Sequence, residues 1–193
     1  EQINRQLTAQ NALLSQLNAT LALLSANDSL TGLSNRRTLM EWGVNECKRA
    51  RRFGHPLSVM VVDIDLFKAV NDGWGHLAGD CVICAVAQTC LARTRQGVDT
   101  VARYGGEEFV LVLPETDTHD ALHLAESLRQ AVAARQVLVG DEGVTVCVTV
   151  SIGVATLHQG SDLSFEDLVK QADKALYQAK ATGRNNVQCC AGC

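Results

Sequence analysis

The chain has 193 residues, of which 47% are hydrophobic and 20% charged, and its formal net charge at neutral pH is −4. These values are typical of a soluble globular protein with one full-sized domain and a short additional segment. They argue against nucleic acid as a partner, because extensive contact with phosphate backbones requires a basic surface. No run approaches the roughly 18 uninterrupted apolar residues of a membrane helix, so no membrane segment is expected in this sequence.

Residues 1–27 carry apolar side chains at alternating spacings of four and three, which is the a/d pattern of a coiled coil. The pattern favours a parallel dimer stalk over the alternative, an amphipathic helix packed on its own domain. Because the sequence begins at Glu1 with no export signal, we expect a piece of a longer protein. The seam consists of Ile3, Leu7, Leu14, Leu17, Leu21 and Leu24, interrupted by Gln10.

Residues 28–188 follow a polar linker and alternate between helical and strand patterns. Ser34 or Asn35 can cap a helix that ends at Gly54, and "LSVMVVDID" is typical of a fully buried strand. "KAVNDGWGH" is expected to form a loop before a second helix. The apolar residues of the first helix are Leu39, Met40, Val44, Cys47 and Phe53, and those of the second are Val82, Ile83, Val86, Ala87, Cys90 and Leu91.

The second half of the domain begins with a predicted hairpin. Gly105 and Gly106 are expected to turn the chain between strands near 100–104 and 109–113, because glycine adopts positive φ without steric cost. Residues 118–134 are helical in pattern, and 144–154 predict one long strand with a single apolar face. Ser164 and Asp167 can cap a last helix that stops at Gly183. The interleaved elements predict an α+β sheet covered by helices.

The eight cysteines are expected to have no metal or redox role. Cys47, Cys81, Cys84, Cys90 and Cys147 lie in apolar segments, where thiols usually act as small buried hydrophobes, which favours a reducing cytoplasm. A metal or redox site at the two CxxC pairs is the less favoured alternative. Residues 189–193 are expected to be a disordered tail.

Acidic residues lie at the ends of two neighbouring predicted strands, where one strand finishes and the other begins. Asp63 and Asp65 follow the first strand, and Glu107 and Glu108 follow the hairpin turn. Carboxylates in such places are costly to desolvate unless they are paired or bind a metal. Four of them favour a hard cation such as Mg²⁺ and phosphoryl or nucleotidyl transfer over the alternative of solvated turn residues. Positive charge for phosphates would come from Lys68, Lys180 and Arg184.

Six ordered motifs between about residues 28 and 187 resemble the GGDEF family, the bacterial diguanylate cyclases. The resemblance implies a nucleotidyl-cyclase-like fold with a central, mostly antiparallel five-stranded sheet flanked by helices, preceded by the coiled-coil helix. The chain carries the GGEEF variant of the family motif. The motifs are "DSLTGLSNRR", "DIDLFKAVND", "GHLAGD", "ARYGGEEF", "VSIGVA" and "ADKALYQAKATGRNNV".

The resemblance also implies the reaction and the residues that perform it. Two GTP-loaded domains would face each other in a homodimer and condense two GTP into cyclic di-GMP and two pyrophosphates. Mg²⁺, or Mn²⁺ in its place, would be held by Asp63, Glu107, Glu108 and the main-chain carbonyl of Ile64, with Glu107 as proton acceptor. Phosphate contacts would come from Leu66, Phe67, Lys68, Lys180 and Arg184. Asn71 and Asp80 would bind guanine, whose paired donors suit a carboxylate.

One departure from the family pattern concerns product inhibition. Many relatives carry an RxxD site, and here Gln96 stands where arginine is expected, although Asp99 is retained. A neutral amide cannot reproduce the bidentate contacts of a guanidinium group, so weak or absent feedback inhibition is expected.

The sequence therefore predicts a cytoplasmic diguanylate cyclase whose output is regulated through the stalk by an upstream sensory domain, in a parent protein whose membrane anchoring stays open. Two alternatives belong to other classes: a catalytically silent GTP-binding signalling module, and a purely structural dimerisation segment. The first would be favoured by degenerate acidic residues, and the second would leave the carboxylates unexplained.

Overall fold

The computed structural model describes residues 26–140 and 143–190. The predicted coiled-coil segment, residues 1–27, lies outside the described residues except for Ala26 and Asn27. These two are not helical, since Asn27 forms an isolated antiparallel bridge with Ser34. None of the described helices is long and apolar enough to cross a lipid bilayer.

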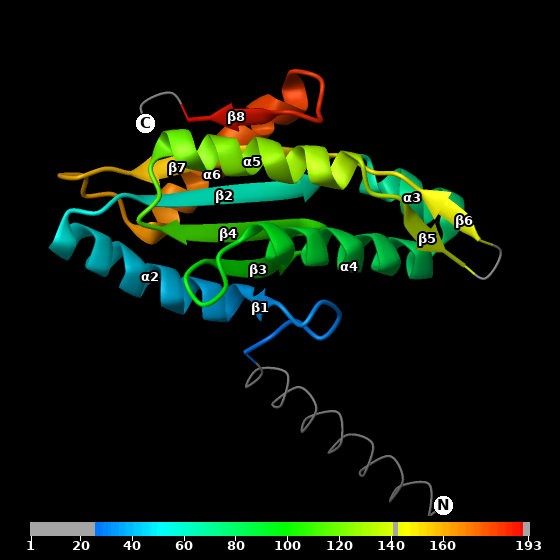
Figure 1. Ribbon diagram of the computed structural model, residues 1–193, viewed down its shortest axis with the longest axis horizontal. Coiled ribbons are helices and arrows are strands. Elements are labelled where there is room, and N and C mark those ends of the chain that lie inside the picture. The colour runs from blue at the N-terminus through cyan, green and yellow to red at the C-terminus, as the bar shows by residue number, and fades with distance from the viewer. Residues whose placement is uncertain (1–25, 141–142, 191–193) are drawn as a thin grey trace, which may run out of the picture.

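A six-stranded sheet forms the centre of the domain, in the order β1-β3-β4-β2-β7-β8 (Figure 1). The inner strands pair antiparallel, whereas the edge strands β1 and β8 run parallel to their neighbours. The predicted α+β class is confirmed. The sheet has six strands rather than the predicted five. Edge strands of two and three residues are too short to show a period in the sequence, so the pattern does not reveal them. The bounds are β1 Ser34–Asn35, β2 Leu57–Ile64, β3 Thr100–Gly105, β4 Glu108–Pro114, β7 Val150–Leu157 and β8 Val187–Cys189.

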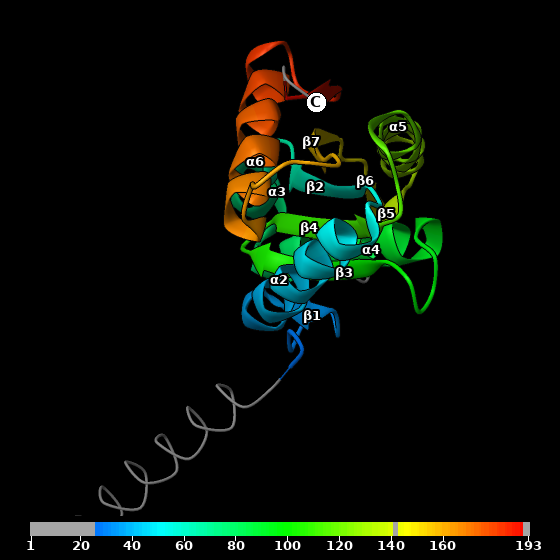
Figure 2. The ribbon, with the colours of Figure 1, turned by 90° about the vertical axis from the view of Figure 1, so that its left-hand side faces the viewer.

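Helices cover both faces of this sheet, as Figure 2 shows. One face packs against α2 (Arg36–Phe53) and α6 (Phe165–Ala181), and the other against α4 (His76–Arg93) and α5 (Thr118–Ala133). The short α3 (Phe67–Trp74) follows the end of β2 and packs on α4. The sheet is therefore buried on both sides, and β2 is buried at all eight positions, as predicted.

Local sequence signals set several helix ends. The Asn35 side chain accepts a hydrogen bond from the Thr38 backbone N–H, and Gly54 ends α2 in the left-handed conformation at φ 70°. Ser164 caps α6 by accepting from the Asp167 backbone N–H, as predicted. The inward face of α2 differs from the prediction, because Val44 is exposed and Phe53 lies at 58% exposure. The buried residues of α2 are Leu39, Gly43, Cys47 and Ala50.

The predicted strand over 144–154 is wrong in two respects. The segment is divided into β6 (Val144–Val146), which pairs with β5 (Val137–Val139) in a separate hairpin, and β7, which joins the main sheet. In addition, β7 is buried on both faces rather than on one. Period-two alternation continues through the break, so the sequence pattern carries no sign of it.

The predicted loop "KAVNDGWGH" is also wrong, because its residues form most of α3 and the start of α4. Two glycines and the absence of a capping side chain hid this helix from the sequence pattern. Its single buried residue, Val70, belongs to the core cluster shared with α4 and α5.

The described cysteines differ in burial, and Cys84 is half-buried. Cys47 and Cys90 are buried as predicted, and burial raises the pKa of Cys90 to about 12, so its thiol stays protonated. Cys81 and Cys147 are exposed, which contradicts the prediction for them. The predicted tail is too long by two residues, since β8 includes Cys189 and the Cys190 N–H donates to the Val154 carbonyl. Residues 191–193 lie outside the described residues.

Candidate functional site

The hairpin between β3 and β4 carries the acidic motif at one end of the sheet. Its two turn residues are Gly106 and Glu107, one position later than predicted, and Gly106 adopts a positive φ of 46°. A register shift between Arg103 and Gly105 accompanies the turn. The Arg103 Nε donates to the Gly106 carbonyl at 2.8 Å, and Nη1 of the same side chain pairs with Asp28 at 3.3 Å. Arg103 thus ties the hairpin to the turn that begins the domain.

The structure places Asp63 and Glu108 directly opposite each other on β2 and β4. Asp63 is only 6% exposed, and its Oδ2 lies 2.8 Å from the Lys180 ammonium on α6. Burial raises the pKa of Asp63, the charges of Glu107 and Asp65 raise it further, and Lys180 acts in the opposite sense. Three segments that are distant in sequence therefore meet at this end of the sheet.

The charge balance of this end suits a bound divalent cation. Burial raises the pKa of Glu108, and the neighbouring charge of Asp63 adds to the effect. Closely spaced carboxylates with raised pKa values are stabilised in their ionised form by added positive charge. All of their donor atoms are oxygens, which hard cations prefer. The residue types present thus fit such a cation, although among the described residues the carboxylate oxygens of Asp63, Glu107 and Glu108 are not all gathered within 4.8 Å of one another. Ile64, whose carbonyl was predicted as a further ligand, is the last residue of β2.

Asp65 differs in role from its acidic neighbours. Its carboxylate accepts hydrogen bonds from the Thr149 hydroxyl at 2.7 Å, the Ser151 hydroxyl at 2.6 Å and the Asn185 backbone N–H at 3.0 Å. A carboxylate with three such donors is well satisfied without a metal. Asp65 therefore anchors the loop that follows α6, and with it the neighbouring Arg184, to the end of β2.

Three of the predicted phosphate-binding residues, Leu66, Phe67 and Lys68, lie at the start of α3. Leu66 precedes this helix in a left-handed conformation, φ 55°, and no side chain caps the helix. The first N–H groups of a helix have no intrahelical acceptor, so Phe67 and Lys68 lie where an anion can be bound. Lys68 and Arg184 are exposed. Lys180 lies on α6, and its ammonium group contacts the Asp63 carboxylate.

Asn71 on α3 and Asp80 on α4, the predicted guanine-binding pair, lie on two helices that pack against each other. Asp80 is the fifth residue of α4 and is half-buried. Between them lies Gly79, which the sequence reasoning did not single out. A Cβ atom at Gly79 would lie 2.0 Å from the Asn71 Oδ1, so the missing side chain leaves room for the Asn71 amide.

Gln96 and Asp99 lie at the opposite end of the sheet from Asp63. Gln96 is exposed, whereas the Asp99 side chain is 1% exposed and is held by Arg95, with Nη2 to Oδ1 at 2.6 Å. The same guanidinium group donates to the Pro114 carbonyl and to the Thr116 hydroxyl. Arg95 lies one position before the place where the family pattern has its arginine, and its side chain forms contacts within the domain.

The mostly antiparallel sheet flanked by helices, with acidic side chains at one end, places this chain in the α+β class. The family model described as "Diguanylate cyclase, GGDEF domain" matches residues 25–186. The chain belongs to this family.

Among its relatives, the response regulator PleD of Caulobacter vibrioides is 43% identical over 164 residues, which cover 85% of this chain and 36% of PleD. The diguanylate cyclase DosC of Escherichia coli is 41% identical over 161 residues, 83% of this chain and 34% of DosC. The chain thus spans about a third of the length of these curated relatives.

A solved structure covers almost the whole chain. The coiled coil and GGDEF domain of DgcB from Caulobacter crescentus, in complex with c-di-GMP, is similar with a TM-score of 0.80 and 30% identity. The match covers 98% of this chain and 100% of that one.

Proposed function

We propose that this chain is an active diguanylate cyclase domain that condenses two GTP into cyclic di-GMP and two pyrophosphates. The observation that carries the proposal is the intact acidic set, Asp63, Glu107 and Glu108, at one end of the sheet beside the start of α3. Membership of the GGDEF family supports the same reaction.

In each half-reaction the 3′-hydroxyl of one GTP attacks the α-phosphorus of the other. A phosphorus–oxygen bond forms, the bond from the α-phosphorus to the bridging oxygen breaks, and pyrophosphate leaves. Glu107 takes up the hydroxyl proton, because it lies in the turn at half exposure, where a substrate can reach it. Two such transfers close the ring.

Asp63, Glu107, Glu108 and the Ile64 carbonyl would hold Mg²⁺, or Mn²⁺ in its place. Such a cation would neutralise phosphate charge and acidify the attacking hydroxyl. The chain's own residues orient the triphosphate: the backbone from Leu66 to Lys68 offers N–H groups, and Lys68, Lys180 and Arg184 offer positive charge.

Asn71 and Asp80 would select guanine. A carboxylate accepts hydrogen bonds from N1–H and the exocyclic amine of guanine, whereas adenine offers no such paired donors. Asn71 and Asp80 lie on α3 and α4, which pack on each other with Gly79 at the contact.

The reaction needs two domains face to face, and residues 1–27 would hold them together as a coiled-coil homodimer that also transmits the signal of an upstream sensory domain. The coiled coil in the similar DgcB structure supports this arrangement. The cytoplasm, where GTP is available, remains the expected location.

A direct test is to incubate the chain with GTP and Mg²⁺ and to identify the products by mass spectrometry. We expect cyclic di-GMP and pyrophosphate. GTP binding without turnover by a demonstrated dimer would instead favour the silent GTP-binding module.

Glu107→Gln should lower the rate by at least about 100-fold, because a well-placed general base contributes a factor of that order. Glu41→Gln, an exposed change on α2, is the control. Circular dichroism should show both variants folded. A Glu107→Gln variant with near-normal turnover would remove Glu107 from the mechanism.

Product inhibition at Gln96 and Asp99 should be weak. The Arg95 guanidinium is already bound to Asp99, Pro114 and Thr116, so it is not available to replace the arginine missing at position 96. Titration of the running reaction with cyclic di-GMP measures this. Tight noncompetitive inhibition that disappears in Asp99→Asn would contradict the expectation.

A further inference from the structure

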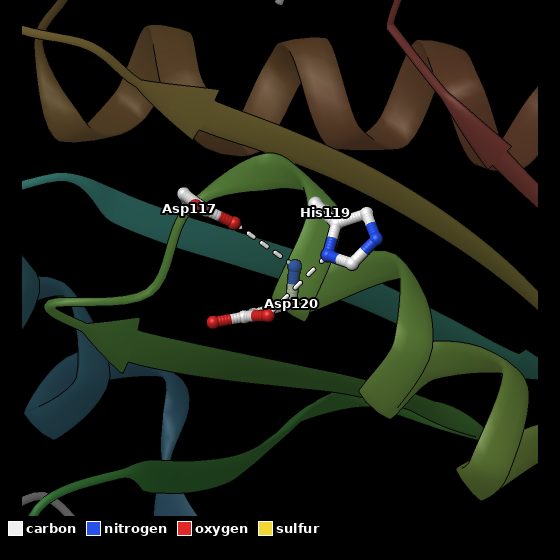
Figure 3. Close-up of side chains that lie close together, drawn as sticks. All are labelled: Asp117, His119 and Asp120. Carbon is white, nitrogen blue, oxygen red and sulfur yellow. Dashed lines mark hydrogen bonds and ion pairs between the residues drawn. The ribbon is translucent and has the colours of Figure 1, made fainter.

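The first two turns of α5 gather metal-ligating side chains far from the acidic end of the sheet. One ligand atom from each of Asp117, His119 and Asp120 lies within 4.8 Å of the others, and all three residues are exposed (Figure 3). β4, which separates Glu108 from this region, has seven residues and so spans about 20 Å. The cluster therefore cannot share a cation with Asp63.

His123 extends this cluster by one helical turn. Residues four apart lie on the same side of a helix, and the Nε2 atoms of His119 and His123 are 3.1 Å apart, with edge-to-face rings. Metal–nitrogen bonds of about 2.0–2.1 Å place two ligand nitrogens about 2.9 Å apart at a right angle and about 3.3 Å apart at the tetrahedral angle. The observed separation, which is also that of a hydrogen bond between the two rings, falls between these values and so matches the spacing of two nitrogen ligands of one ion.

Asp120 supplies the supporting contact that metal-binding histidines commonly have. The Nδ1 of His119 lies 3.4 Å from the Asp120 Oδ1. A carboxylate only accepts hydrogen bonds, so Nδ1 carries the proton and the lone pair of Nε2 is left to face His123. An imidazole that donates its other N–H to a carboxylate is oriented as a ligand and made more basic.

The charges around the site permit a cation at the start of a helix. The helix dipole disfavours positive charge there, but Asp117 at the N-cap and Asp120 in the first turn add two negative charges. The Asp117 side chain also fixes the turn, because it accepts a hydrogen bond from the Asp120 backbone N–H at 2.9 Å.

We propose that His119 and His123, oriented by Asp120, form a binding site for one transition-metal dication of the Zn²⁺, Ni²⁺ or Cu²⁺ class. Imidazole nitrogens select these ions over Mg²⁺, which requires oxygen ligands. The site is independent of the cyclase reaction. Asp120 also borders a surface cavity with Arg95 and Asp99, so a bound ion would lie next to the retained part of the inhibitory motif.

The test is calorimetric titration of the full chain with Ni²⁺ in buffer with a large excess of Mg²⁺, which binds oxygen ligands and does not compete for imidazole. One equivalent should bind in a step that His119→Ala and His123→Ala each abolish. Asp120→Asn should weaken this step by about 10- to 100-fold, as expected for a supporting partner. His76→Ala, at the distant start of α4, is the matched control and should leave the step unchanged.

The exposed cysteines need a separate control, because thiolates also bind these ions. Alkylation of the thiols should leave the histidine-dependent step in place. A step that survives both histidine substitutions but disappears on alkylation would overturn the proposal, as would the absence of any saturable step. Both histidines are exposed, so the variants should fold, and their thermal unfolding without metal should match that of the unmodified chain.

Discussion

The Lys180→Met substitution should destabilise the metal-free domain, because Lys180 provides the positive charge nearest to the buried carboxylate of Asp63. The two side chains are 2.8 Å apart, and those of Asp63 and Lys180 are 9% and 34% exposed. A hydrogen bond between charged groups contributes about 1.5–3 kcal/mol. Solvent screens the charge of the partly exposed Lys180, which favours the lower end of this range. Asp63 can also take up a proton once Lys180 is removed, which limits the loss of stability. We expect a loss of about 1.5–2 kcal/mol in the free energy of unfolding at pH 7.5, or about 3–8 °C in Tm.

The loss should depend on pH in a defined direction. Because the pKa of Asp63 is raised in the folded protein, its ionisation costs stability as the pH rises through that value, and removal of Lys180 increases this cost. The difference between the variant and the unmodified chain should therefore be complete at neutral pH. It should shrink as the pH falls toward about 4, where a protonated Asp63 has no charge to pair.

The assay is denaturant and thermal unfolding between pH 4 and 8, with and without Mn²⁺ and in the absence of nucleotide. A divalent ion replaces the missing ammonium without competition from it, so Mn²⁺ should raise the Tm of Lys180→Met more than that of the unmodified chain. Lys174→Met, an exposed position on the same helix, is the control. Equal stability of the two variants, or an equal response to Mn²⁺, would refute the reasoning.

Two further predictions concern glycines that other groups approach closely. Gly79→Ala should leave stability unchanged or improve it slightly, but its Cβ would displace the Asn71 amide. KM for GTP should rise and discrimination against ATP should fall, which initial-rate kinetics with the two nucleotides measure. Gly153→Ala should cost about 3 kcal/mol or more in urea unfolding, because its Cβ would lie 2.0 Å from the Ala172 carbonyl and 2.2 Å from the Leu176 nitrogen, which forces α6 away from β7. Gly73→Ala, whose Cβ would have open space around it, is the control for both variants. Unchanged nucleotide selectivity in Gly79→Ala, or unchanged stability in Gly153→Ala, would contradict the corresponding prediction.

Local chemistry made much of the fold predictable. Asn35 and Ser164 cap their helices through contacts that span three residues, and Gly54 ends α2 through its own left-handed backbone. The continuous apolar run of β2 predicts burial on both faces, and the structure confirms it. In each case the determining interaction lies within a few residues of the signal, so one sequence suffices to find it.

Contacts between distant segments explain where the prediction failed. The alternation of 144–154 does not reveal that β6 pairs with β5 while β7 enters the main sheet, a division that lies next to the hydrogen bonds of Asp65 to Thr149 and Ser151. The short α3 is stabilised mainly by packing on α4 rather than by helix propensity.

The sequence by itself determined which residues could do the chemistry, because carboxylates at strand ends and glycines at a turn follow from local pattern and burial. Tertiary structure alone decided how these residues are used. It paired Lys180 with Asp63 across more than a hundred residues, gave Asp65 three hydrogen-bond donors instead, and brought Gly79 against Asn71. The reason is physical: charge and hydrogen-bonding capacity belong to a side chain, whereas the partner that satisfies them is set by which strands and helices pack side by side.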